Sequence, residues 1–200
     1  MKSFAVLALM AVAFTAPSWA QSSSSFANDH AEVGVFADYL RFSPTDPVIN
    51  FVGVGGRLGV NVHPNVQLEG EINYDFERNR TVFYDTGVGS TFVRTGVRPL
   101  SGLFGPKFQA GTSGPVRFFV TGKVGFIDFS TSGGAVNGTN FSNAINGVGN
   151  AGTHVAFYPG AGIEGFIGPV GLRLDVGDEI YLNNGAYNNL RVTFGPHFRF

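Results

Sequence analysis

Several residue types that mark other classes of protein are absent or scarce in this chain of 200 residues. It contains no cysteine, which excludes a disulfide framework and any thiolate metal or redox site. Charged residues make up only 14%, against about 25% in a typical soluble domain. Because 13 Lys and Arg face 14 Asp and Glu, the chain lacks the basic excess that a nucleic-acid partner would require.

Glycine and phenylalanine are the abundant residues, at 29 and 21 copies. Glycine is therefore about twice as frequent as its ordinary share of roughly 7%. Many aromatic side chains with little charge argue against intrinsic disorder, and the length suits one domain. The composition therefore predicts an ordered domain that has an unusual use for both residues.

The N-terminus has the pattern of a secretory signal peptide. Lys2 is followed by an apolar run from Phe4 to Phe14, and Ser18-Trp19-Ala20 offers small residues before a cleavage site between Ala20 and Gln21. The alternative is a buried N-terminal helix. No later stretch reaches the roughly 18 consecutive apolar residues of a membrane helix. We therefore expect a signal peptide over 1–20, a flexible tail over 21–30 and one exported domain over 31–200.

Strict alternation of apolar and polar residues is clearest from Val66 to Glu77. Val66, Leu68, Ile72 and Tyr74 share one face, and the opposite face is strongly acidic. A period of two over twelve residues predicts a β-strand with one apolar and one charged face. Similar patterns, three of them weaker, predict eight strands at 31–42, 51–62, 66–77, 101–111, 116–126, 155–167, 170–177 and 189–200.

The length of these strands and the spacing between them favour a barrel that spans a membrane. Strands of roughly 11–14 residues exceed the usual 5–6 and suit a tilted membrane span, which needs about 9–11. The connections alternate between long and short, as in outer-membrane barrels with long outer loops and short periplasmic turns. We predict an all-β fold, an eight-stranded antiparallel up-and-down transmembrane β-barrel with both chain ends at the short-turn side.

The charged faces of the strands would line the interior of such a barrel. The interior of eight strands is just wide enough to be filled by side chains, and buried charges need partners. We therefore predict an interior charge network, in which Glu69 and Glu71 pair across the barrel with Arg117, Lys123 or Arg191. Inward glycines, among them Gly162, would make room for long Arg and Lys side chains. The network comprises Arg57, Glu69, Glu71, Asp75, Arg117, Lys123, Glu164, Arg173, Asp175 and Arg191, and the same parity places Asp38, Lys107 and Arg199 inside.

Residue patterns for catalysis or metal binding are scarce. The four histidines, His30, His63, His154 and His197, show no metal-ligand spacing. The acidic segment 175–179 lacks the alternating ligands of an EF-hand loop and is interpreted as a strand that ends at the rim. We predict no catalytic residues, no metal site, no cofactor and no enzymatic activity.

The chain resembles the small bacterial outer-membrane β-barrel proteins of the OmpA transmembrane-domain, OmpX and opacity-protein kind. The resemblance rests on the signal peptide, the eight amphipathic strands, the segment Gly-Leu-Arg-Leu-Asp-Val at 171–176 and the C-terminal strand. It implies that Val192, Phe194, Phe198 and Phe200 form the signal that the barrel assembly machinery recognises. Two near copies, Phe-Gly-Pro-Lys-Phe at 104–108 and Phe-Gly-Pro-His-Phe at 194–198, predict a shared bulge in two equivalent strands.

The function expected from these features is that of an integral protein of the cell outer membrane, with a structural or surface-interaction role in adhesion or envelope integrity. Its partners would be outer-membrane lipid, the barrel assembly machinery and a surface ligand held by the long loops 77–100 and 127–154. A narrow passive channel is the first alternative. A secreted soluble β-barrel binding protein is the second.

Overall fold

The computed structural model describes residues 30–45, 48–85, 90–111, 114–132 and 152–200. The predicted signal peptide, its cleavage site at Ala20 and Gln21, and residues 21–29 of the predicted tail lie outside these residues. No helix long and apolar enough to cross a membrane is found in the described part of the chain.

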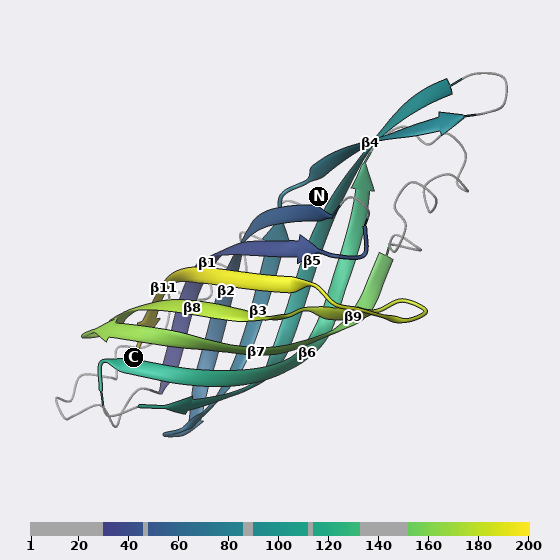
Figure 1. Cartoon of the computed structure of the whole chain (residues 1–200). Coiled ribbons are helices and arrows are strands. Elements are labelled where there is room, and N and C mark those ends of the chain that lie inside the picture. The colour runs from purple at the N-terminus through teal and green to yellow at the C-terminus, as the bar shows by residue number, and fades with distance from the viewer. Residues whose placement is uncertain (1–29, 46–47, 86–89, 112–113, 133–151) are drawn as a thin grey trace, which may run out of the picture.

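Strands make up nearly all of the described structure (Figure 1). Eight of them form a closed ring in the order β1, β2, β3, β5, β6, β7, β8, β11 and back to β1, and every pairing is antiparallel. Three shorter strands, β4, β9 and β10, extend hairpins beyond the ring. The bounds are β1 Ala31–Phe42, β2 Ile49–His63, β3 Val66–Asp75, β4 Arg78–Asp85, β5 Ser90–Ala110, β6 Val116–Ser132, β7 Gly152–Ile167, β8 Val170–Asp178, β9 Ile180–Leu182, β10 Ala186–Tyr187 and β11 Leu190–Arg199.

The pairing of the first strand with the last closes the barrel. β1 lies against β11 from Glu32↔Arg199 to Arg41↔Leu190, and β11 lies on its other side against β8. Closure leaves no open edge among the eight ring strands, so their backbone donors and acceptors pair within the sheet. The predicted all-β, eight-stranded antiparallel barrel is confirmed.

The outer face of the barrel is apolar and the inner face is charged, which is the reverse of the arrangement in a soluble protein. In β3, Leu68 and Ile72 are 39% and 48% exposed, whereas Gln67 and Glu69 on the opposite face are at most 1% exposed. The same alternation recurs in β6, where Phe118 and Val120 face outward and Arg117 is buried. An apolar exterior with a charged interior is the arrangement that a hydrocarbon surrounding requires.

The two ends of the barrel differ in the length of their connections. At the turn end, which holds Ala31 and Arg199, strands are joined through 64–65, 111–115 and 168–169. Gly168 adopts φ +63° in the last of these turns, a conformation that favours glycine. At the opposite end, the loop end, the connections are longer. Both chain ends of the barrel thus lie at the short-turn side, as predicted.

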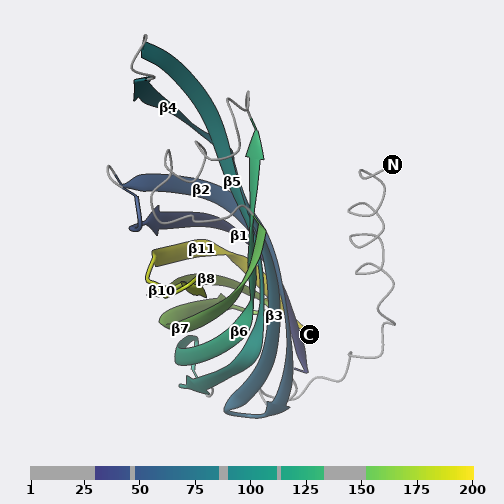
Figure 2. The same cartoon turned by 90° about the vertical axis from the view of Figure 1, so that its right-hand side faces the viewer.

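The two long connections contain more strand than the sequence predicted. Residues 77–100 were expected to be a loop, but β4 and the first part of β5 occupy most of this range and pair from Arg78↔Val97 to Asp85↔Ser90. This hairpin stands out beyond the ring (Figures 1 and 2). In the second range, 127–154, β6 continues to Ser132 and β7 begins at Gly152, while 133–151 lies outside the described residues. The mixed Arg, Thr, Phe and Val pattern of the first range was mistaken for loop because its alternation carries no single apolar face.

The expected bulge at the two Phe-Gly-Pro copies is wrong. The register of β5 against β6 is the same at Phe104↔Val124 as at Lys107↔Thr121, and β11 against β1 likewise keeps its register past Pro196. What the two copies share is a glycine whose backbone lies very close to the neighbouring strand. A Cβ on Gly105 or Gly195 would collide with a carbonyl oxygen of the neighbouring strand. Each glycine therefore lets the two strands approach closely, so that their hydrogen-bond ladder continues past the neighbouring proline, which has no N–H to donate.

This close approach predicts that Gly195→Ala lowers the free energy of unfolding by about 1–3 kcal/mol, because backbone atoms of Val35 and Phe36 would have to move. Gly165→Ala is the matched control, since its new Cβ would meet nothing within 4 Å. Urea unfolding of both variants in lipid vesicles measures the difference. Equal stabilities of the two variants would contradict the close-approach explanation.

Candidate functional site

The interior of the barrel holds fifteen buried Asp, Glu, Lys and Arg side chains among the described residues. All ten residues of the predicted network lie there, together with Asp38, Lys107 and Arg199. Two carboxylates, Glu32 and Glu179, were not in the prediction. Continuing the alternation of β1 back from Asp38, and that of β8 past Gly177, would have found both. The buried charges are the cations Arg57, Lys107, Arg117, Lys123, Arg173, Arg191 and Arg199 and the anions Glu32, Asp38, Glu69, Glu71, Asp75, Glu164, Asp175 and Glu179.

Glu69 and Glu71 of β3 form the centre of the network. The Lys123 ammonium on β6 reaches both carboxylates, at 2.7 Å from Glu71 Oε2 and in direct contact with Glu69 Oε1. Arg57 on β2 lies 3.3 Å from Glu69 and 3.0 Å from Glu71. Two strands that are not neighbours are therefore joined through the interior to the same pair of acids.

Arg173 and Arg191 connect Glu69 and Glu71 to two further strands, β8 and β11. Arg173 on β8 donates to Glu69 at 2.5 Å and to Asp175 at 2.7 Å, and its Nη1 also lies 3.2 Å from Glu164. Arg191 on β11 donates to Asp38 at 2.7 Å and to Glu71 at 2.9 Å. These fork-shaped contacts are the strong, charge-assisted kind.

The network also includes contacts that the sequence did not predict. Arg117 lies 3.5 Å from Glu32 of β1, although it was paired with Glu69 or Glu71 in the prediction. Glu179 was expected at a solvated rim, but it is 1% exposed and lies 3.1 Å from Arg191. Asp75 is reached through an amide, because Asn73 Nδ2 donates to both Asp38 and Asp75. Parity gives the direction of a side chain but not its height along the barrel, so the pairs could not be assigned.

Glycine has a different role inside the barrel from the one predicted. A Cβ on Gly55 would collide with the ring of Phe36, and one on Gly162 would collide with the ring of Phe119. Gly160 and Gly177 both face the ring of Tyr158 at 2.6–2.7 Å from a built Cβ. The glycines thus make room for aromatic rings that lie against the inner wall rather than directly for Arg and Lys.

The cations of the network lie over these rings. The Arg173 guanidinium is 4.0 Å from the centroid of Phe119, and that of Arg57 is 4.7 Å from Phe36. Desolvated cation–π contacts of this kind contribute about 2 kcal/mol or more. In each of these layers a ring packs against a glycine and a guanidinium lies over the ring. The sequence prediction placed charged residues and glycines in the interior and did not include these rings.

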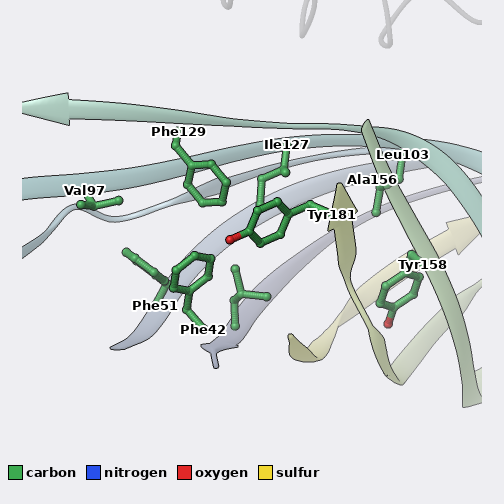
Figure 3. Packing of buried hydrophobic residues seen from close by; sticks show 10 residues of the cluster. Phe42, Phe51, Val97, Leu103, Ile127, Phe129, Ala156, Tyr158 and Tyr181 are labelled. Atoms are coloured by element: carbon green, nitrogen blue, oxygen red, sulfur yellow. The ribbon is translucent and has the colours of Figure 1, made fainter. Parts of the chain in front are cut away.

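An apolar cluster of buried side chains packs inside the barrel toward the loop end (Figure 3). Phe42, Phe129 and Tyr181 pack together, with ring centroids 5.2–5.9 Å apart, and Phe51 meets Phe42 edge-on at 6.0 Å. The His154 ring joins them at 5.9 Å from Tyr181. The interior therefore has a charged section and an aromatic section toward the loop end.

One group of residues has ligand types that could hold a metal ion. Oxygen atoms of Glu32 and Glu164 and a ring nitrogen of His197 lie within 4.8 Å of one another. Three separate strands bring them together, so no sequence spacing signals the group. However, the Lys107 ammonium already contacts Glu164 at 2.7 Å and Glu32 at 3.2 Å. A positive charge at this point makes the group part of the ion-pair network rather than an evident metal centre.

Three residues of the predicted assembly signal, Val192, Phe194 and Phe198, lie on the outer face of β11, and the fourth, Phe200, directly follows this strand. Phe194, Phe198 and Phe200 are about half exposed, and Val192 is partly buried in the same row. β11 is also the strand that closes the ring onto β1.

Comparison with protein-family models and with curated protein sequences finds no match to this chain. Solved structures do match it. Neisserial surface protein A aligns with a TM-score of 0.54 and 9% identity, over 85% of this chain and 97% of that one. The outer membrane protein OprG from Pseudomonas aeruginosa aligns with a TM-score of 0.54 and 10% identity, over 88% and 99%. The chain thus has the fold of the small outer-membrane β-barrels, as the resemblance implied.

The ion pairs predict strong coupling between Lys123 and Glu71. Breaking a buried pair from one side costs about 3–5 kcal/mol, because it leaves a charge without its partner. Lys123→Met and Glu71→Gln should each destabilise the barrel, and the double variant should lose about 0.5–3 kcal/mol less than their sum. Urea unfolding in vesicles measures the cycle.

A control cycle combines Lys123→Met with Asp178→Asn. Asp178 accepts hydrogen bonds from Asn188 and Asn189 at the loop end, whereas Lys123 contacts Glu69 and Glu71 in the interior. Its effect should add to that of Lys123→Met within about 0.5 kcal/mol. Additive losses in the Lys123 and Glu71 cycle would argue against the coupling.

Proposed function

We propose that the chain is an integral protein of the bacterial outer membrane with a structural or surface-interaction role, in adhesion or envelope integrity, and without catalysis. The observation that carries this proposal is the inverted barrel, apolar outside and ion-paired inside. Water is a poor surrounding for such an exterior, since soluble proteins rarely expose large continuous apolar surfaces. A bilayer is the surrounding in which both faces are satisfied.

The route to the membrane is part of the same proposal. The predicted signal peptide over 1–20, cut between Ala20 and Gln21, would export the chain. The row Val192, Phe194, Phe198 and Phe200 would then be recognised by the barrel assembly machinery as β11 closes the ring. Residues 31–200 would form the inserted domain.

The loop end supports an interaction role. The hairpin of β4 and β5 extends beyond the ring, whereas the turn end has only short connections (Figure 2). Rigid barrels that present extended segments at one end are suited to contacts outside the membrane, because the scaffold fixes the base of each segment. The regions 77–100 and 127–154 are the proposed contact surfaces for a surface ligand.

The alternative of a narrow passive channel has less support. Ion pairs link all eight ring strands across the interior, and the aromatic cluster packs inside the barrel toward the loop end. A water path would have to displace paired charges and packed rings. We therefore favour a filled barrel over a conducting one.

Membrane insertion predicts that the cost of a charge on the outer wall depends on depth. Val120→Arg places the charge in the middle of the apolar wall and should lower the free energy of unfolding in vesicles by about 2–4 kcal/mol. Val116→Arg, at the turn end of the same strand, should cost about 0–1 kcal/mol. Both valines are outward-facing and exposed, so the pair differs in depth alone.

In a soluble barrel, both substitutions would be surface changes within about 0.5 kcal/mol of neutral. Equal, small effects together with recovery of the protein from the soluble periplasm would therefore contradict the proposal. Purified outer membranes should instead yield a protein that migrates differently on a detergent gel before and after boiling, as folded membrane barrels do.

A filled interior predicts that the reconstituted protein shows no steady ion conductance in planar bilayers. Removing rings from the aromatic cluster and one central cation, with Phe42→Ala, Phe129→Ala and Lys123→Ala combined, should produce openings if the variant still folds. Steady conductance of the unmodified protein, altered by charge exchange at Lys123, would instead favour the channel.

A further inference from the structure

Among the described residues, three buried acids in the loop-end half of the barrel share one arginine. Asp38, Asp75 and Glu179, the loop-end acids, are each at most 2% exposed. Arg191 donates to Asp38 at 2.7 Å and lies 3.1 Å from Glu179. The same guanidinium also donates to Glu71 at 2.9 Å. Negative charge is therefore in excess here, and a buried charge without a partner is costly.

The other charged or titratable groups around the loop-end acids have partners of their own. Glu71 is in contact with Lys123 of β6 and Arg57 of β2, at 2.7 and 3.0 Å. The Tyr158 hydroxyl of β7 donates to Asp175 of β8 at 2.8 Å. The cations that reach this part of the interior from neighbouring strands are thus held by other carboxylates. The excess negative charge has to be removed in another way.

Asp38 of β1 and Asp75 of β3 meet over a glycine of the strand between them. In the register of the sheet, Gly53 of β2 lies opposite both residues. A Cβ on Gly53 would lie 2.6 Å from Asp75 Oδ1, so the absence of a side chain makes room for this carboxyl group. Asn73 Nδ2 donates to Oδ2 of both acids, at 3.0 and 3.1 Å, and holds the two groups side by side.

The contact between these two acids requires a proton. Their side chains lie within hydrogen-bonding reach of each other, and an ionised carboxylate can only accept a hydrogen bond. Two carboxyl groups that share a site in this way do not both ionise. Asp38 is the one that stays ionised, because it contacts Arg191. Asp75 Oδ1 is buried and accepts no hydrogen bond from the described residues, so the proton belongs on Asp75.

A proton fits this place better than a metal ion. In the part of the chain that the structure describes, one group of three His, Asp or Glu ligand atoms lies within 4.8 Å of one another, and it consists of Glu32, Glu164 and His197. The loop-end acids are not part of that group. A shared proton needs only two oxygens in contact, which Asp38 and Asp75 provide.

We propose that Asp75 holds a proton that it shares with Asp38, and that this carboxyl pair is a pH-sensitive latch inside the loop end. The inner wall continues toward the loop end with Leu40 of β1, Phe51 of β2 and Tyr181 of β9, which belong to the apolar cluster (Figure 3). Loss of the proton places two negative charges in contact next to packed side chains, where little water can solvate them. The latch is therefore strongest in acid and weakens as the pH rises.

Infrared spectroscopy of the folded protein in vesicles tests for the proton itself. At neutral pH, the spectrum of the unmodified protein minus that of Asp75→Asn should contain the C=O stretch of a protonated carboxyl group. Asp175→Asn is the matched control, because Asp175 contacts Arg173 at 2.7 Å and is ionised. The difference spectrum for Asp175→Asn should contain carboxylate bands instead.

Urea unfolding in vesicles at a series of pH values tests the latch. Above about pH 4 the unfolded chain releases the Asp75 proton while the folded barrel keeps it, so stability falls as the pH rises. Relative to Asp75→Asn, the unfolding equilibrium constant of the unmodified protein should rise about tenfold per pH unit, until Asp75 ionises in the folded state. Asp75→Asn should therefore be more stable than the unmodified protein at neutral pH, whereas Asp175→Asn should be less stable.

A difference spectrum without the protonated C=O stretch would overturn the proposal, as would a pH dependence that Asp75→Asn leaves unchanged. If a chelator lowers the stability of the unmodified protein but not that of Asp75→Asn, a metal ion occupies the place of the proton and the proposal is wrong. Should Asp75→Asn fail to fold, the unmodified protein decides the matter alone. Its infrared spectrum must then lose a protonated C=O stretch when the medium is made alkaline, and absence of that stretch at neutral pH refutes the latch.

Discussion

Closure of the sheet is the constraint on which the rest of this structure depends. A strand in hydrocarbon has no water to satisfy an open edge, so β1 must pair with β11 before the apolar wall can face lipid. Closure also determines how the side chains inside the barrel must be arranged. Every second side chain of eight strands is directed into a space that is just wide enough to be filled. Charges placed there have no bulk water to solvate them and must therefore find one another.

The interior meets this demand with a layered arrangement of glycine, aromatic ring and cation. Glycine on one strand admits a ring such as Phe119, and the ring carries a guanidinium such as that of Arg173. The guanidinium then reaches acids on other strands, which makes the pairs long-range in sequence. Buried ion pairs are weak evidence for net stability, because desolvation offsets much of the attraction. Here they join strands that do not pair in the sheet, such as β3 with β8.

The two ends of the barrel differ in the segments that they present. The turn end has short connections, the start of β1 and the end of β11, and its described charges are directed inward. The loop end holds the projecting hairpin of β4 and β5. A rigid, filled barrel between them anchors these features without needing to move. The likeness to Neisserial surface protein A and OprG fits this architecture and, at 9% and 10% identity, concerns the fold alone.

The sequence by itself determined the strands, their alternation and the inward direction of the charged rows, because all three depend on a period of two that is local to each segment. The span 31–42 agrees with β1 to the residue, and Arg191 lies inside as its parity required. The partners of these charges were decided only by the tertiary structure. Which acid faces Arg117, or that Glu179 lies inward beside Arg191, depends on the stagger between strands, which closure sets and no local pattern records.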